Sequence, residues 1–205
     1  QKTGVVRNCQ NYNEIRYLAQ THPEKFDQSK FNILTVARFG KEKGILRAIK
    51  AVLGVCDDFD DINYYIIGDG AQSRQAEMLV SDGKFSDSVT LLGKKENPYG
   101  YMAAADILLI PSFSEAAPMV INESACLGTP ILSTETSSAF EMVRDTGFGW
   151  VCDNSENGIR DVLRRLAASR DEVNYKRKLL STRRFDNAEA VKQFSELINH
   201  NDKTD

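Results

Sequence analysis

The stretch DILLIPS, residues 106–112, decides the fold class of this chain. Its apolar run is unbroken, which suits a strand of a parallel sheet that is covered on both faces. Similar short runs occur on both sides of it and alternate with amphipathic stretches of helical period. The other runs that we expect to be strands are ILTVAR (33–38), YYIIG (64–68), VTLLG (89–93), PILST (130–134) and GWVCD (149–153). This alternation predicts an α/β fold, a Rossmann-like doubly wound parallel sheet.

Helices are expected between these strands and after the last of them. Periodic apolar residues predict helices near residues 45–56, 72–80, 99–105, 118–127 and 139–143. After Asn154, one helix is expected around 159–166 and another around 191–198. The chain begins without methionine, which we take to indicate a piece of a longer protein. We divide it into a connector (1–30), a ligand-binding domain (31–180) and a C-terminal helical tail (181–205).

The composition excludes several classes of function. With 205 residues, 41% hydrophobic and 27% charged, the chain can bury a substantial core. A formal net charge of -3 provides no overall basic field, so we do not expect nucleic-acid binding. No apolar stretch is long enough to span a bilayer, and the first residues lack the pattern of a signal peptide. We therefore expect a cytoplasmic location, and buried, reduced thiols for the four cysteines.

Ligands of such sheets bind at the carboxyl ends of the strands, where this sequence places two groups of polar residues. After the first strand, Arg38 and Lys43 lie in RFGKEKG (38–44), and two cations beside a helix start favour a diphosphate over a solvated basic turn. After the second strand, Gly68 and Gly70 permit a tight turn that a ligand can approach. The spacing of these glycines does not fit the G-x-G-x-x-G pattern of an NAD site.

Two glutamates follow the fourth predicted strand. Glu115 falls in the loop and Glu123 inside the next helix, for which Pro118 suits the first turn. The N–H groups of that turn, Ala117 to Val120, can bind phosphate oxygens. A carboxylate on the helix suits a ribose, and one in the loop suits the hydroxyls of a sugar. The alternative is a capping Glu115 and a surface Glu123, but the apolar neighbours of Glu123 make a surface position less favourable.

Together these motifs resemble one family. VARFGKEKG, IIGDGAQ, VTLLGKKEN, YMAAADILLIPSFSEAAPMVINESACLGTPIL and SSAFEMV, in this order over about 31–180, resemble the C-terminal, donor-binding domain of GT-B glycosyltransferases, specifically the retaining family 4. The resemblance implies half of an enzyme that moves a sugar from a nucleoside-diphosphate sugar, with a UDP-sugar favoured, to a glycan or lipid-linked acceptor. An N-terminal domain would bind the acceptor, and the C-terminal helix would cross back to it. This chain alone is then expected to be inactive.

The resemblance also implies roles for residues. Arg38 and Lys43 would bind the diphosphate and stabilise it as it departs, Glu115 would contact the sugar, and Glu123 would hold the ribose. As catalytic residues it implies Arg38, Lys43 and Glu115, and as donor-binding residues Gly68, Gly70, Ala117, Pro118, Met119, Val120 and Glu123. No metal and no cofactor are expected, and peripheral association of a full-length enzyme with the inner face of a membrane is compatible with this function.

Some positions depart from the family pattern or leave alternatives open. Ala116 and Ala117 stand where the family has glycine and an aromatic residue, and Ser137 and Ser138 replace a glycine pair. Tyr99 and Tyr101 either pack a short helix or line a uracil pocket. The acidic run DDFDD (57–61) is interpreted as a solvated turn at the opposite edge of the sheet, not as a metal site. The alternative functions are a nucleotide-sugar-binding module without transfer activity and another GT-B enzyme, such as a nucleotide-sugar epimerase.

Overall fold

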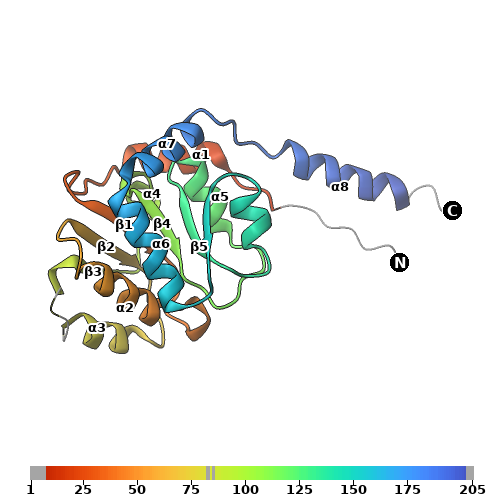
Figure 1. The fold of residues 1–205 in the computed structure, drawn as a ribbon. Helices are drawn as coiled ribbons and strands as arrows, with labels where there is room; N and C mark the ends of the chain where they lie inside the picture. Colours follow the sequence, from red (N-terminus) through yellow and green to blue (C-terminus); the bar gives the residue numbers. More distant parts are fainter. Residues whose placement is uncertain (1–7, 82–83, 85, 202–205) are drawn as a thin grey trace.

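The computed structural model describes residues 8–81, 84 and 86–201 and contains one parallel sheet (Figure 1). Its strands lie in the order β3-β2-β1-β4-β5-β6, and every neighbouring pair is parallel. The strands are β1 (Phe31–Val36), β2 (Ile62–Ile67), β3 (Val89–Gly93), β4 (Ile107–Ile110), β5 (Ile131–Thr134) and β6 (Gly149–Cys152). The doubly wound, Rossmann-like sheet predicted from the sequence is confirmed.

Helices cover both faces of this sheet, because successive residues of its central strands point to opposite sides. Ile33 of β1 packs with α2 (Ile45–Val55) and α6 (Glu156–Ala168), whereas Leu34 packs with α4 (Tyr99–Ala104) and α5 (Met119–Cys126). All four residues of β4 are buried. A third helix, α3 (Ser73–Ser81), lies beside α2, and a π-helical turn spans Phe140–Arg144. The unbroken apolar run of DILLIPS therefore reflects a strand with a core on each side.

Two helices of the structure were not predicted. Residues 1–30 were expected to form only a connector, but α1 (Tyr12–Thr21) lies there and packs against α4 and α5. The second, α7 (Arg170–Ser181), follows α6 directly and contributes Val173 to one core and Leu180 to the other. Each of them buries only two residues, and neither lies between two strands, so the alternation of strands and helices in the sequence does not point to it.

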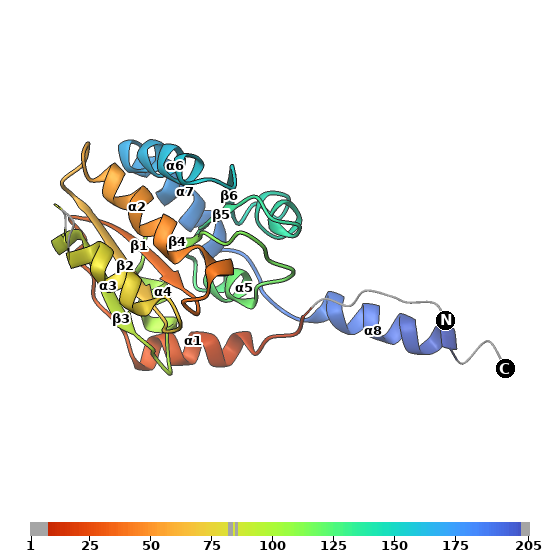
Figure 2. The ribbon, with the colours of Figure 1, turned by 90° about the horizontal axis from the view of Figure 1, so that it is seen from below.

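The predicted C-terminal helix is present as α8 (Ala188–Asn201) and extends away from the sheet (Figures 1 and 2). Its apolar residues Val191, Phe194 and Ile198 are 57%, 57% and 47% exposed. One apolar side of α8 is therefore exposed. None of the described helices is long and apolar enough to cross a membrane.

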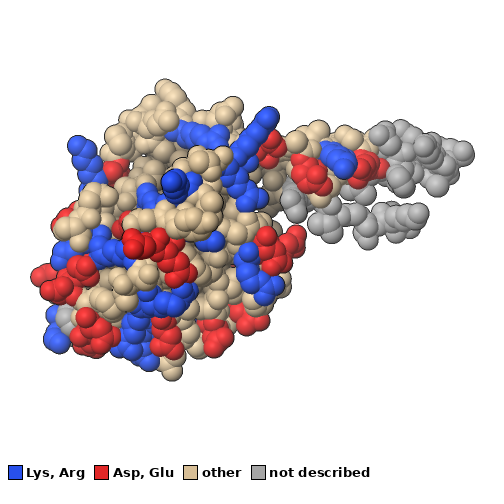
Figure 3. Space-filling view, turned by 45° about the horizontal axis from the view of Figure 1, so that its top comes forward, with Lys and Arg blue, Asp and Glu red and all other residues tan. Residues whose placement is uncertain are grey.

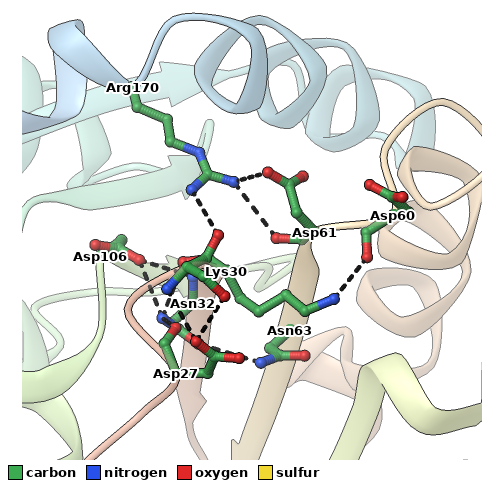
Figure 4. Close-up of polar contacts among 9 residues, drawn as sticks. Asp27, Lys30, Asn32, Asp60, Asp61, Asn63, Asp106 and Arg170 are labelled. Carbon is green, nitrogen blue, oxygen red and sulfur yellow. Dashed lines mark hydrogen bonds and ion pairs between the residues drawn. The ribbon is translucent and has the colours of Figure 1, made fainter.

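A polar network holds the amino ends of the strands (Figure 4). Arg170, at the start of α7, binds the carboxylate of Asp61, and the N–H group of Asn32 donates to Asp106 Oδ2 at 2.8 Å. Asp58 also pairs with Arg164, at 2.5 Å, so the run 57–61 forms ion pairs as well as contacting solvent. The contact between Arg170 and Asp61 anchors α7 at the edge of the sheet opposite the carboxyl ends of the strands. On the face shown in Figure 3, acidic and basic side chains are interspersed.

Candidate functional site

A small cavity of about 60 Å³ lies at the carboxyl ends of β1 and β4. Lys43, Glu115, Pro118 and Val120 are among its lining residues, so the structure brings together four of the residues that the sequence singled out. Lys43 ends a short 3-10 turn before α2, while the other three lie in or just after the β4–α5 loop. These residues lie close together because a parallel sheet aligns the carboxyl ends of neighbouring strands at one edge.

Lys43 and Glu115 form an ion pair in this cavity. The distance from Lys43 Nζ to Glu115 Oε1 is 2.6 Å, and the two side chains are 22% and 12% exposed. Ser112 Oγ donates to the same carboxylate oxygen at 2.7 Å. An anion that binds Lys43 can displace Glu115 from the pair, which would release the carboxylate for the hydroxyl groups of a ligand.

The backbone of Glu115 is held by the two serines that depart from the family pattern. Ser137 Oγ and Ser138 Oγ lie 2.8 and 3.4 Å from the carbonyl oxygen of Glu115 and donate to it. Sequence reasoning noted these serines only as departures and did not consider Ser112. The spacing S-x-x-E, with a hydroxyl three residues before the glutamate, is the signal that could have drawn attention to Ser112.

Arg38 was expected to converge with Lys43, but it does not line the cavity. It lies two residues beyond the end of β1 and is exposed, and its side chain makes no hydrogen bond or ion pair to the residues that the structure describes. The chain around it is ordered by its neighbour Phe39, which is 2% exposed and whose N–H group donates to Asp69 O at 2.9 Å. The structure thus presents one cation in the cavity and a second at its exposed margin.

Gly68 and Gly70 have positive φ values of 144° and 156°, which agrees with the tight turn expected from the sequence. The space beside them is occupied by the loop after β1. A Cβ atom at Gly68 would lie 1.8 Å from the carbonyl oxygen of Ala37, and one at Gly70 would lie 2.9 Å from Phe39 N. Both glycines therefore allow two backbone segments to pack closely, and a contact with a ligand stays a prediction.

The helix predicted after Glu115 is confirmed as α5, with Pro118 in an extended conformation just before it. Because α5 starts at Met119, its first N–H groups, including those of Met119 and Val120, have no acceptor within the helix. Ala117 precedes them and is exposed. Pro118 has no N–H group and can only shape the turn. The carbonyl of Met119 accepts a hydrogen bond of 2.9 Å from Gln10 Nε2, which ties this turn to the N-terminal part of the chain.

Glu123 lies inside α5, as predicted, and is half-buried. Burial raises the pKa of its carboxyl group. Among the described residues, no donor binds this carboxylate. The pKa of Tyr99 in α4 is also raised, first by burial and then by the charge of Glu123, so the two side chains are neighbours. Tyr99 and Tyr101 both pack against the core on the α4–α5 side of the sheet, which supports the packing alternative for these tyrosines.

Two further findings limit the chemistry of the site. Within the described part of the chain, no group of three or more histidine, cysteine, aspartate or glutamate side chains could hold a metal ion. Cys56, Cys126 and Cys152 are buried and Cys9 is exposed, and all four are free thiols. The expectation of buried, reduced thiols is therefore confirmed for three cysteines. For Cys9 the expected burial is wrong, because this residue is exposed.

Sequence comparisons relate the chain to carbohydrate-active enzymes. The amylovoran biosynthesis glycosyltransferase AmsK of Erwinia amylovora is 30% identical over 167 residues, which are 74% of this chain and 41% of AmsK. The lipopolysaccharide core biosynthesis glycosyltransferase LpsE of Rhizobium meliloti is 28% identical over 127 residues, covering 62% of this chain and 34% of LpsE. The chain thus spans less than half the length of these relatives.

A solved structure and a family model also relate the chain to glycosyltransferases. Anabaena HepE, solved in complex with UDP, matches with a TM-score of 0.76 at 18% identity and covers 96% of this chain and 57% of HepE. At this identity the likeness concerns the fold, which is that of GT-B glycosyltransferases. The family model described as "Glycosyl transferases group 1" matches residues 19–179. This match covers well over half of the 205 residues of the chain, so the chain belongs to the group 1 glycosyltransferases.

Proposed function

We propose that this chain is the donor-binding half of a retaining, family 4 glycosyltransferase that uses a nucleoside-diphosphate sugar, with a UDP-sugar favoured. The observation that carries the proposal is the Lys43–Glu115 pair in the cavity beside the start of α5. A cation, free helix N–H groups and a carboxylate are the three groups that a diphosphate joined to a sugar requires. The structural likeness to HepE, which was solved with UDP, supports the choice of nucleotide.

In the proposed reaction, the bond between the sugar and the diphosphate breaks, and a bond forms between the sugar and the hydroxyl oxygen of the acceptor. Negative charge grows on the departing diphosphate, which can take up the proton of that hydroxyl group. Lys43 and the N–H groups of Met119 and Val120 can stabilise this charge, with Arg38 contributing once a ligand reaches the exposed loop. Glu115, released from Lys43, would bind the sugar hydroxyls. Because these groups supply positive charge themselves, we propose that no metal ion is required.

Glu123 is assigned to the ribose of the donor. Its carboxylate is half-buried and accepts no hydrogen bond from the described residues, so two neighbouring hydroxyl groups of a ribose would satisfy it. Gly68 and Gly70 are assigned to the same nucleotide because their turn borders the loop that carries Arg38. The buried position of a carboxylate without a donor is unfavourable in the free protein, which favours a binding role over a structural one.

The acceptor and the rest of the enzyme are also proposals. AmsK and LpsE, whose names place them in amylovoran and lipopolysaccharide core biosynthesis, are more than twice as long as the segments that match this chain. We propose that an N-terminal domain binds a glycan or lipid-linked acceptor of polysaccharide biosynthesis, that residues 1–30 connect the two domains, and that α8 returns to the first. The enzyme would act in the cytoplasm, with peripheral association to the inner face of a membrane where the acceptor is lipid-linked, and without nucleic acid.

The first test is calorimetric titration of the chain with UDP, GDP, ADP and NAD, without metal and then with magnesium. We expect UDP to bind without metal, and Glu123→Ala to weaken it by roughly tenfold or more, the scale of a lost hydrogen-bond pair to a charged group. Glu77→Ala, which removes an exposed carboxylate of α3, is the matched control and should leave the affinity unchanged.

The outcomes separate the alternatives. Binding of NAD alone, or equal affinity of the Glu123→Ala variant and the wild type, would contradict the proposed donor site. Tight binding of GDP or ADP in place of UDP would correct the base but keep the donor site. In a full-length protein that binds UDP-sugars, the absence of transfer to any glycan acceptor would favour the binding module, and interconversion of two UDP-sugars would favour an epimerase.

A further inference from the structure

Arg47, in the first turns of α2, lies beneath the β4–α5 loop. Its Nε and Nη2 atoms both donate to the carbonyl oxygen of Pro111, at 3.0 and 2.7 Å. Its guanidinium group stands 3.7 Å from the centroid of the Phe113 ring. One side chain of α2 therefore holds two residues of the segment that leads from β4 to Glu115.

Asn154, which follows β6, completes the same arrangement. Arg47 donates to the carbonyl oxygen and to Oδ1 of Asn154, at 3.2 and 2.6 Å. The amide nitrogen of Asn154 in turn donates to the carbonyls of Phe113 and Glu135, at 3.0 and 2.7 Å. The pair thus connects the segments after β4, β5 and β6 to α2, all at the edge of the sheet that carries the candidate site.

The remaining contacts of this segment show how closely it approaches Lys43. The N–H group of Phe113 donates to the carbonyl of Glu42 at 2.8 Å, one residue before Lys43. A Cβ atom on Gly44 would lie 2.1 Å from the carbonyl oxygen of Pro111. The backbone of the turn that carries Lys43 is therefore in direct contact with the β4–α5 loop that carries Glu115. Arg47 belongs to α2, which continues that turn, and it donates hydrogen bonds to the loop.

The charge of Arg47 is unusual for a residue with a purely structural role. No carboxylate among the described residues pairs with it, and burial lowers its pKa. Such a cation costs free energy unless its donors are satisfied, and here backbone carbonyls and one amide satisfy them. Arg47 donates to Pro111 and Asn154 from three separate nitrogens of a planar group, and the single ammonium nitrogen of a lysine could not reproduce this set of hydrogen bonds.

We propose that Arg47 is a positioning residue for the donor site, which together with Asn154 holds the β4–α5 loop so that Glu115 faces Lys43. This inference rests on the proposed function, in which that pair receives the diphosphate and the sugar. Arg47 acts through the loop and does not touch the ligand itself.

The first experiment needs no ligand. Hydrogen exchange of the Phe113 amide is compared in the wild type and in the variants Arg47→Lys, Arg47→Met and Asn154→Ala. We expect exchange at Phe113 to become about tenfold faster or more in all three, the scale of lost charge-assisted hydrogen bonds. The amide of Leu108 within β4, which donates to Pro130 at 2.9 Å, should keep its protection. Faster exchange at both amides would indicate global destabilisation and overturn the positioning role.

The second experiment connects Arg47 to the ligand. We expect UDP to bind the Arg47→Met variant about tenfold more weakly, and the double variant Arg47→Met/Lys43→Met to bind no more weakly than Lys43→Met alone, because the two residues act as one unit. Additive effects, or an effect no larger than that of Lys50→Met, which removes an exposed cation of α2, would overturn the inference. If Arg47→Met does not fold, Asn154→Ala replaces it in the comparison of single and double variants. Asn154 is exposed, so its substitution should disturb folding less. If the wild type binds no UDP, the proposed nucleotide is wrong, and exchange at Phe113 alone decides the role of Arg47.

Discussion

At the scale of the residue, Glu123 shows how a binding role conflicts with stability. Burial raises the pKa of its carboxyl group, so its ionised form is less favourable in the folded chain than in the unfolded one. The contribution of Glu123 is thus most favourable below its unfolded pKa and is lost as the pH rises through the folded pKa. At neutral pH the ionised carboxylate lowers the stability of the free protein.

We therefore predict that Glu123→Gln stabilises the ligand-free chain at pH 7.5, by on the order of 1 kcal/mol for a half-buried charge. Near pH 4, where the wild-type carboxyl group is largely protonated, the two proteins should differ little. Urea unfolding at the two pH values measures this difference, with Glu77→Gln as the exposed control. Equal stabilisation at both pH values would show that the ionisation of Glu123 is not the cause.

The sequence singled out Lys43, Glu115, Pro118 and Val120, which line the cavity, but not the partners of these residues. Lys43, Glu115 and Glu123 were chosen because they follow strands or start helices, which is a local property of the sequence. The pairing of Lys43 with Glu115 joins residues 72 positions apart, and the contacts of Ser137 and Ser138 with Glu115 join residues 22 and 23 apart. Such contacts depend on how neighbouring loops meet, and no local pattern contains this information.

At the scale of the element, the junction before α2 depends on a glycine. Gly44 has a φ of 66° and packs against the carbonyl of Pro111, so a side chain there meets both backbone strain and a collision. Gly147 has a similar φ of 75°, but nothing lies within 4 Å of the position of its Cβ atom. The two glycines therefore separate the effect of the backbone conformation from that of close packing.

We predict that Gly147→Ala costs about 1–2 kcal/mol, the price of a left-handed conformation for a residue with a Cβ atom. Gly44→Ala should cost at least about 2 kcal/mol more, because the α2 junction must move away from Pro111. Urea unfolding of both variants measures the difference, and calorimetry with UDP tests whether Gly44→Ala also weakens binding. Equal costs would mean that the junction adapts without strain.

The elements themselves were predictable to different degrees. The helices α2 and α6 follow from apolar periodicity because each buries a broad face, as α2 does with six buried residues. The shorter faces of α3 and α4 bury one and two residues, and these helices follow from their place between successive apolar strands. In contrast, α1 and α7 were missed. The two buried residues of α7, Val173 and Leu180, lie two turns apart and contact different cores. The positions between them on that face hold Lys176 and Arg177, so the sequence shows no continuous apolar stripe. Its place at the edge of the sheet depends on tertiary contacts such as that between Arg170 and Asp61.

At the scale of the whole molecule, this chain corresponds to 41% of AmsK and 34% of LpsE. In the proposed enzyme, the donor site faces an acceptor domain and α8 contacts that domain through its exposed apolar residues, Val191, Phe194 and Ile198. Burial of such residues is worth about 1.5–3 kcal/mol each, which would fasten the two domains to each other.

We predict that residues 1–205 bind the donor nucleotide but transfer no sugar, because we propose that the acceptor binds to another domain. A coupled assay for released UDP, with the chain at high concentration and a panel of glycan acceptors, measures this directly. The same assay on a longer chain that includes an acceptor domain is the positive control. Sugar transfer by residues 1–205 alone would contradict the proposal that donor and acceptor bind to different domains.

The sequence by itself determined the parallel α/β sheet, the order of its strands along the chain and four of the residues that line the cavity, because these depend on local apolar period and on the residues that follow each strand. Tertiary structure alone decided that Lys43 pairs with Glu115, that Arg38 remains outside the cavity, and that Arg47 and Asn154 hold the loop between β4 and α5. These contacts join segments 41 to 107 residues apart and depend on the distances between loops at the sheet edge. Those distances are set by the packing of the helices on both faces of the sheet, which is a property of the folded molecule and of no single segment.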